Sequence, residues 1–192
     1  MNLLYPKIKL ASLPFMIGVS VYGALIAGLY GILHDQITYS ISPEYFTKLK
    51  FAQFHYADFG LPDRFFAGTI GFLSSWWVGF AAAWFLARTT LPHWKQSIAF
   101  KKCLFGFGII LGSAVLAGIT GWLLAALQPD ENSTWTPGIE ELGVIEPRSF
   151  VTVAYIHNAG YIGGMIGLIA ALLLVRRQKM NGKAAAAQGS PD

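Results

Sequence analysis

The sequence has few charged residues. Only 12% of its 192 residues are Asp, Glu, Lys or Arg, whereas 54% are hydrophobic. Soluble globular domains carry charge at about 25% of their positions, so this composition excludes an ordinary soluble domain. The net charge of +4 does not indicate a nucleic-acid partner, because the basic residues lie in short segments beside apolar runs, where membrane topology accounts for them. We therefore expect a membrane protein whose main partner is the lipid bilayer.

Cysteine and the common catalytic motifs are also scarce. A single cysteine, Cys103, excludes an internal disulfide and a cluster of thiolate ligands, so a metal ion would need histidine and carboxylate ligands. The chain has no G-x-S-x-G motif, no Walker lysine loop and no dinucleotide-binding fingerprint outside its apolar runs. These absences exclude the enzyme classes that such motifs identify.

Long apolar runs are abundant by contrast. Each can cross the ~30 Å hydrocarbon core of a bilayer as a helix of about 20 residues. The four runs lie near residues 13–33, 65–87, 103–127 and 150–175. They predict an all-α fold, an integral membrane four-helix bundle that forms a single domain over residues 1–180. Residues 181–192, with an alanine run and a Gly-Ser-Pro ending, are expected to be a disordered tail.

The charges between these runs are sorted by sign. Ten of the fourteen basic residues lie before the first run, between the second and third runs, or after the fourth. Nine of the ten acids lie in the other two connections. By the positive-inside rule, both termini face the cytoplasm, and residues 36–63 and 128–148 lie outside.

The first outer connection is long enough to form a structure of its own. Residues 34–64 far exceed what a hairpin between two helices needs, so we expect an outer cap. Ser42, Pro43 and Glu44 resemble a helix start, and an apolar stripe follows at helical spacing. The stripe consists of Tyr45, Leu49, Ala52, Tyr56 and Phe59. It favours an interfacial amphipathic helix, whereas residues 37–42 fit either a short strand or the end of the first helix.

Polar residues with metal-binding side chains gather on the outer side. The candidates are His34, Asp35, Glu44, His55 and His157. His157 lies within the fourth apolar run, where an ionisable group is costly and needs a partner, so we expect it to meet His34 or Asp35. Histidine with carboxylate is an ordinary ligand set for zinc, iron or copper. The alternative is that these residues only cap helices and form hydrogen bonds between them.

Helix geometry limits which candidates can share one ion. Glu44 and His55 are eleven residues apart, which corresponds to ~16 Å along a continuous helix. They therefore cannot bind one ion together, and the spacing matches no established metal-binding motif.

Three segments carry a resemblance to other proteins. Residues 34–38 read HDQIT, residues 44–47 read EYFT and residues 76–79 read WWVG. With them the chain resembles an uncharacterised family of small bacterial four-helix membrane proteins that has no assigned activity. The resemblance covers roughly the first half of the chain and implies a bacterial inner membrane.

Three hypotheses for the function follow. The first is a non-enzymatic assembly or interaction subunit, which would use the cap and the small residues at four-residue spacing to bind a second copy or other membrane subunits. The second is a membrane metalloprotein, an oxidoreductase or a hydrolase, that uses the outer histidine and carboxylate side chains. The third is a transporter of a small solute or ion. The middle of each predicted membrane helix contains no charged residue, which argues against this hypothesis.

Overall fold

The computed structural model describes residues 9–127 and 135–188, with side chains as far as residue 178. The described residues form helices and connecting turns, with no strand among them. The long helices are α1 (Leu13–Ile41), α3 (Asp63–Thr90), α4 (Gln96–Ala126) and α6 (Pro147–Gln188). The short ones are η1 (Leu10–Ser12), η2 (Tyr45–Lys50), α2 (Phe51–Gln53), η3 (His55–Ala57) and α5 (Thr136–Glu141).

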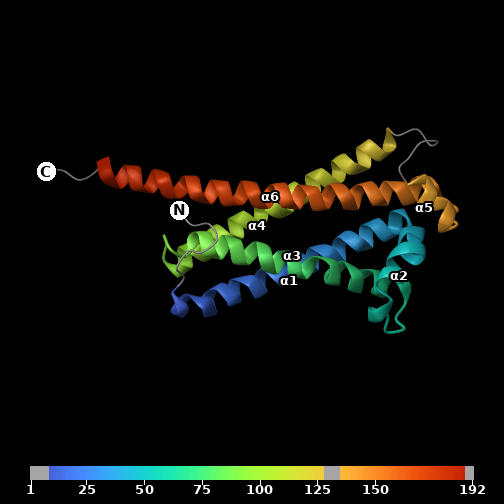
Figure 1. Ribbon diagram of the computed structural model, residues 1–192, viewed down its shortest axis with the longest axis horizontal. Coiled ribbons are helices and arrows are strands. Elements are labelled where there is room, and N and C mark those ends of the chain that lie inside the picture. Colours follow the sequence, from blue (N-terminus) through green and yellow to red (C-terminus); the bar gives the residue numbers. More distant parts are fainter. Residues whose placement is uncertain (1–8, 128–134, 189–192) are drawn as a thin grey trace.

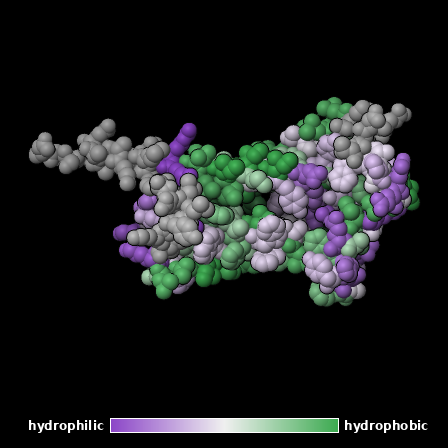
Figure 2. All heavy atoms as spheres, viewed as in Figure 1, coloured by the Kyte–Doolittle hydropathy of each residue, from purple (hydrophilic) through white to green (hydrophobic). Residues whose placement is uncertain are grey.

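The four long helices confirm the predicted all-α bundle. Each is long and apolar enough to cross a membrane. The start of α1 and the end of α6 lie at one end of the molecule, whereas α2 and α5 lie at the other, which we call the cap end (Figure 1). In Figure 2, hydrophobic side chains cover the middle of the visible face and hydrophilic ones gather towards both ends. This distribution is that of a membrane-spanning protein.

Three helix boundaries differ from those expected. Helix α1 continues past residue 33 to Ile41. Residues 37–41 are therefore the end of the first helix and not a short strand. Helix α4 begins at Gln96, seven residues before the apolar run. Helix α6 extends to Gln188, beyond the expected start of the disordered tail at residue 181, because alanine is the strongest helix former. Residues 189–192 lie outside the described part.

The bundle is built from two close helix pairs, α1 with α3 and α4 with α6. Glycines allow the close approach. A Cβ atom on Gly31 of α1 would overlap the carbonyl oxygen of Gly71 in α3, and one on Gly121 of α4 would lie 2.5 Å from the carbonyl oxygen of Tyr155 in α6. In a membrane, close van der Waals packing of this kind holds helices together, because lipid leaves no hydrophobic driving force between them. The small-residue spacing therefore serves packing within each pair.

The two pairs are joined by one apolar cluster towards each end. Towards the termini, Met16 of α1 packs with Leu86 of α3, Phe107 of α4 and Ala171 of α6. At the cap end, Phe46 of η2, which is fully buried, packs with Phe150 of α6 and Ala67 of α3. The cap therefore helps to hold the two pairs together.

The predicted cap helix exists, but its buried face differs from the expected one. Ser42 accepts a hydrogen bond from the backbone N–H of Tyr45 (3.4 Å), and Tyr45 is buried as predicted. Ala52, Tyr56 and Phe59 are exposed instead. The physical reason is that η2 is a π-helix, whose wider turn shifts the later residues away from a 3.6-residue stripe.

Two tryptophans of α3 lie on the outside of the bundle. Trp76 is 40% exposed and Trp77 is 58% exposed. They therefore do not fill the bundle interior but lie on the apolar outer surface of a predicted membrane span.

Candidate metal centre

A group of metal-binding side chains is buried between the two helix pairs near the cap end. His34 and Asp35 lie on α1, and His157 lies on α6. One ligand atom from each of the three residues lies within 4.8 Å of the other two. Asp35 and His157 are only 3% and 6% exposed. The structure thus brings together residues that are more than 120 positions apart in the sequence.

The group lies well inside the helices. His157 is ten residues after the start of α6 at Pro147, which corresponds to ~15 Å along the helix. His34 is seven residues before the end of α1 at Ile41, or ~10 Å along that helix. The contact of His157 with both candidates on α1 agrees with the expectation from the sequence.

The contacts among the three side chains are close. The Nε2 atom of His157 lies 3.8 Å from Oδ1 of Asp35, and the rings of His157 and His34 are 4.7 Å apart between centroids, edge to face. Within the described part of the chain, the Asp35 carboxyl group receives no hydrogen bond, and the approach of His157 is its ion-pair contact. A buried carboxylate without hydrogen-bond donors is costly, so this group either takes up a proton or is neutralised by a cation beside it.

Thr38 positions the ring of His157. Its hydroxyl group donates a hydrogen bond to the backbone carbonyl of His34 (3.0 Å), one turn earlier on α1. The same oxygen lies 3.2 Å from Nε2 of His157 and accepts a hydrogen bond from that nitrogen when it carries a hydrogen. This contact orients the imidazole of the metal-free protein, and a metal bound at Nε2 would replace it, because that nitrogen cannot carry a hydrogen and bind an ion at the same time.

Aromatic rings close the centre towards the cap end. The ring of Tyr45 lies 5.1 Å from that of His157, and the ring of Phe46 lies 6.2 Å from it. Both residues belong to η2 and are buried. The π-helix thus covers the centre, and such helices occur often at functional sites.

The cap also places a cation near the centre. Lys50, the last residue of η2, has its Nζ atom 5.8 Å from the centre of the Tyr45 ring. Burial lowers the pKa of its amine, and the negative charge of Asp35 partly offsets that effect. Burial also raises the pKa of the Tyr45 hydroxyl group, so this phenol is neutral at physiological pH. Lys50 partly balances the charge of Asp35.

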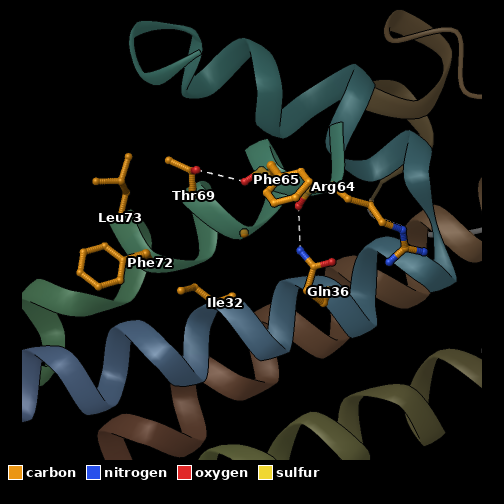
Figure 3. A pocket seen from close by; sticks show the side chains of 8 residues that line it. Ile32, Gln36, Arg64, Phe65, Thr69, Phe72 and Leu73 are labelled. Atoms are coloured by element: carbon orange, nitrogen blue, oxygen red, sulfur yellow. Dashed lines mark hydrogen bonds between the residues drawn. The ribbon is translucent and has the colours of Figure 1, made fainter. Parts of the chain in front are cut away.

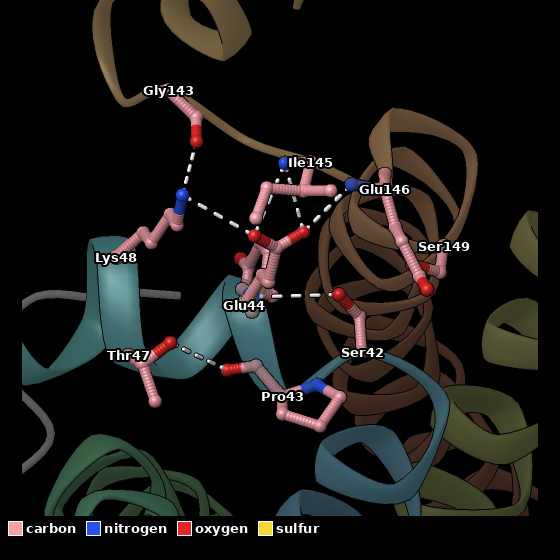
Figure 4. Close-up of polar contacts among 10 residues, drawn as sticks. Ser42, Pro43, Glu44, Thr47, Lys48, Gly143, Ile145, Glu146 and Ser149 are labelled. Carbon is pink, nitrogen blue, oxygen red and sulfur yellow. Dashed lines mark hydrogen bonds and ion pairs between the residues drawn. The ribbon is translucent and has the colours of Figure 1, made fainter.

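Glu44 is not part of the centre. Its carboxylate accepts hydrogen bonds from the backbone N–H groups of Ile145 (3.1 Å to each oxygen) and Glu146 (2.7 Å), just before α6 (Figure 4). It also pairs with Lys48 at 3.3 Å, and Lys48 donates a hydrogen bond to the carbonyl of Gly143. The hydrogen bond from Glu146, together with those from Ile145 and Lys48, lowers the pKa of Glu44. Glu44 therefore joins the cap to the segment before α6.

His55 is also outside the centre. It is exposed, and its Nδ1 atom lies 3.1 Å from the carbonyl oxygen of Ala52 on its own segment. Of the five candidate ligands, the structure thus brings three together and places two elsewhere. Sequence reasoning missed Thr38, whose signal was its position four residues after His34, on the same face of a helix.

The two imidazoles and one carboxylate at this spacing suit a transition metal. Zinc binds nitrogen and oxygen ligands at about 2.0–2.2 Å, so in a tetrahedral site the ligand atoms lie about 3.3 Å from one another. The ligand atoms lie within 4.8 Å of one another, so binding of a metal would require the three side chains to move closer together. Three protein ligands leave one position for water or a substrate, as in catalytic rather than structural zinc sites.

Comparisons with other proteins give no family for this chain. No family model matches it, and neither a curated protein nor a solved structure does. The resemblance of residues 34–47 and 76–79 to small bacterial membrane proteins therefore stays a prediction.

Proposed function

We propose that this chain is a multi-pass membrane metalloprotein that binds zinc, iron or copper through His34, Asp35 and His157. The observation that carries the proposal is the convergence of three ligand atoms, from two helices of different pairs, within 4.8 Å in a buried place. Buried ionisable groups inside membrane helices are expensive and mark function by default. The open coordination position favours a hydrolase with zinc or an oxidoreductase with iron or copper.

The distribution of charge supports one orientation of the protein, and so of the metal centre, in the membrane. Ten basic residues lie in the segments at the terminal end, against four in the segments at the cap end. We propose that the cap end faces outward from a bacterial inner membrane and that both termini are cytoplasmic. The metal would then be exchanged from the extracytoplasmic side.

The role of an assembly or interaction subunit stays a prediction. The glycines that suggested it are used within the helix pairs, since Gly31 meets Gly71 and Gly163 meets Ala117 and Ser113. Their use there weakens the case for self-association through these residues. A partner subunit that binds the cap is compatible with a metal centre beneath it.

Metal content of the detergent-purified protein tests the proposal. We expect close to one equivalent of zinc, iron or copper in the wild type after metal supplementation, and loss of that metal in His157→Gln and in Asp35→Asn. His55→Gln is the matched control, because it removes an exposed histidine of the same end without touching the centre. Equal metal content in His157→Gln and His55→Gln would contradict the proposal.

A further inference from the structure

A groove lies on the outside of the first helix pair. It has a volume of about 630 Å³, within the range of ~300–1,000 Å³ that is usual for ligand sites. Helices α1 and α3 form its two sides (Figure 3). Its apolar lining comes from Ile32, Phe65, Phe72 and Leu73, whereas Gln36 and Arg64 lie at its cap end. Gly68 also lines the groove, and a Cβ atom there would lie 3.3 Å from Nε2 of Gln36 and 3.6 Å from Ile32.

The surroundings of the groove are the bilayer itself. Ile32 belongs to the candidate span Leu10–Ile41, and Phe72 and Leu73 belong to the span Asp63–Thr90. Phe65 is 68% exposed, and Leu33 beside Ile32 is 66% exposed. An acyl chain is therefore the group that meets this apolar lining in a membrane.

The cap end of the groove holds a positioned cation. The Nη2 atom of Arg64 donates a hydrogen bond to the hydroxyl oxygen of Ser40 (3.0 Å), and its guanidinium group lies 5.2 Å from the centre of the Tyr39 ring. Among the described residues, no carboxylate forms an ion pair with Arg64, and that of neighbouring Asp63 accepts a hydrogen bond from Tyr39 (3.4 Å). Four of the five guanidinium N–H donors remain for a ligand.

The backbone adds to this positive field. Arg64 is the second residue of α3, and Gln36 fixes that helix start to α1 by donating a hydrogen bond to the carbonyl of Arg64 (2.8 Å). The N-terminal end of a 28-residue helix carries partial positive charge, which favours an anion, and the carboxylate of Asp63 in the first turn offsets part of that charge. A guanidinium group binds phosphate through paired hydrogen bonds.

We propose that this groove binds an anionic phospholipid, with the phosphate at Arg64 and one acyl chain along Phe65, Phe72 and Leu73. Charge and shape select this occupant together: a cation at the depth where headgroups lie, and an apolar channel that continues from it towards the membrane centre. The site is independent of the metal centre.

Lipid retention measured by native mass spectrometry tests the site. The full chain is released from detergent micelles that contain phosphatidylglycerol or phosphatidylcholine with the same acyl chains. We expect one tightly retained phosphatidylglycerol, and Arg64→Gln should weaken its retention roughly tenfold, the loss of a charge-assisted hydrogen bond. Arg64→Lys should fall between the wild type and Arg64→Gln. Arg148→Gln is the matched control, because it removes an exposed cation at the same end, on α6.

A second variant tests the acyl chain. Thr69 lines the groove and its hydroxyl group bonds only within its own helix, to the carbonyl of Phe65 (3.0 Å). Thr69→Phe should fill the groove and lower the retention of both lipids. The melting temperature without added lipid reports on folding of each variant. Equal retention of the two lipids by the wild type, or equal losses in Arg64→Gln and Arg148→Gln, would overturn the proposal, as would full retention in folded Thr69→Phe.

Discussion

Replacing His157 by leucine removes the imidazole from the centre while keeping an apolar side chain of similar size in its place. The ring is 6% exposed and offers Nε2 to Thr38 at 3.2 Å and to Asp35 at 3.8 Å. Thr38 keeps its own donation to the carbonyl of His34, so it loses only one of its partners. Asp35 loses its ion-pair contact in a buried place.

The expected cost follows from these losses. Leaving a buried polar group without its partner costs about 1–3 kcal/mol, so we expect a loss of about 2 kcal/mol in the free energy of unfolding of the metal-free protein. For a chain of this size that corresponds to roughly 4–8 °C in melting temperature. His157→Gln retains a side-chain donor and acceptor, so it should lose less than His157→Leu.

Adding metal to the same assay distinguishes the structural role of His157 from its role in metal binding. A ligand at a hundred times its dissociation constant stabilises the folded state by about 2.7 kcal/mol, so zinc should raise the melting temperature of the wild type. Both variants should lose this increase, although they differ without metal. If His157→Leu melts at the wild-type temperature in metal-free detergent, or if zinc still stabilises either variant, the reasoning about this centre is wrong.

Three further predictions concern packing, pH and topology. Gly31→Ala should lower the free energy of unfolding by about 2–3 kcal/mol, because its Cβ atom would overlap the backbone of α3. Gly18→Ala is the control and should not destabilise the protein, because a Cβ atom there meets no atom within 4 Å. Thermal melts compare the two variants. Because hydrogen bonds lower the folded-state pKa of Glu44 below its ordinary value of 4.5, the stability that it contributes is present above that value and is lost as the pH falls below it. Glu44→Gln should remove this part of the pH dependence in acid titrations that are followed by circular dichroism, and an unchanged acid transition would contradict the role of Glu44. A cysteine introduced as Gly138→Cys should react with an impermeant thiol reagent from outside the cell, and labelling only from the cytoplasm would overturn the proposed orientation.

The spanning helices could be predicted because lipid demands long apolar runs, but their true ends could not. Helix α1 continues beyond the apolar run through His34, Asp35 and Thr38, because the bundle and the cap bury Asp35 and Thr38 and partly bury His34. Packing between helices thus overrides the apolar signal at the end of a span.

The candidate centre was predictable in part for the same reason. An ionisable residue inside an apolar run, His157, needed a partner, and the end of the first run supplied it. The place of His55 was not predictable, since the π-helix η2 and the short helices after it decide which residues face inward. The contribution of Lys50 was missed because the expected stripe treated the cap as a regular α-helix.

X-ray absorption at the metal edge of the loaded protein tests the central claim most directly. The account predicts only nitrogen and oxygen ligands at about 2.0–2.2 Å, with the outer-shell scattering of two imidazole rings, from His34 and His157. His157→Gln, taken through the same loading and washing, should lose the metal and with it the absorption edge and its imidazole scattering. A wild-type spectrum without imidazole scattering, or one that His157→Gln leaves unchanged, would contradict a metal centre at His34, Asp35 and His157.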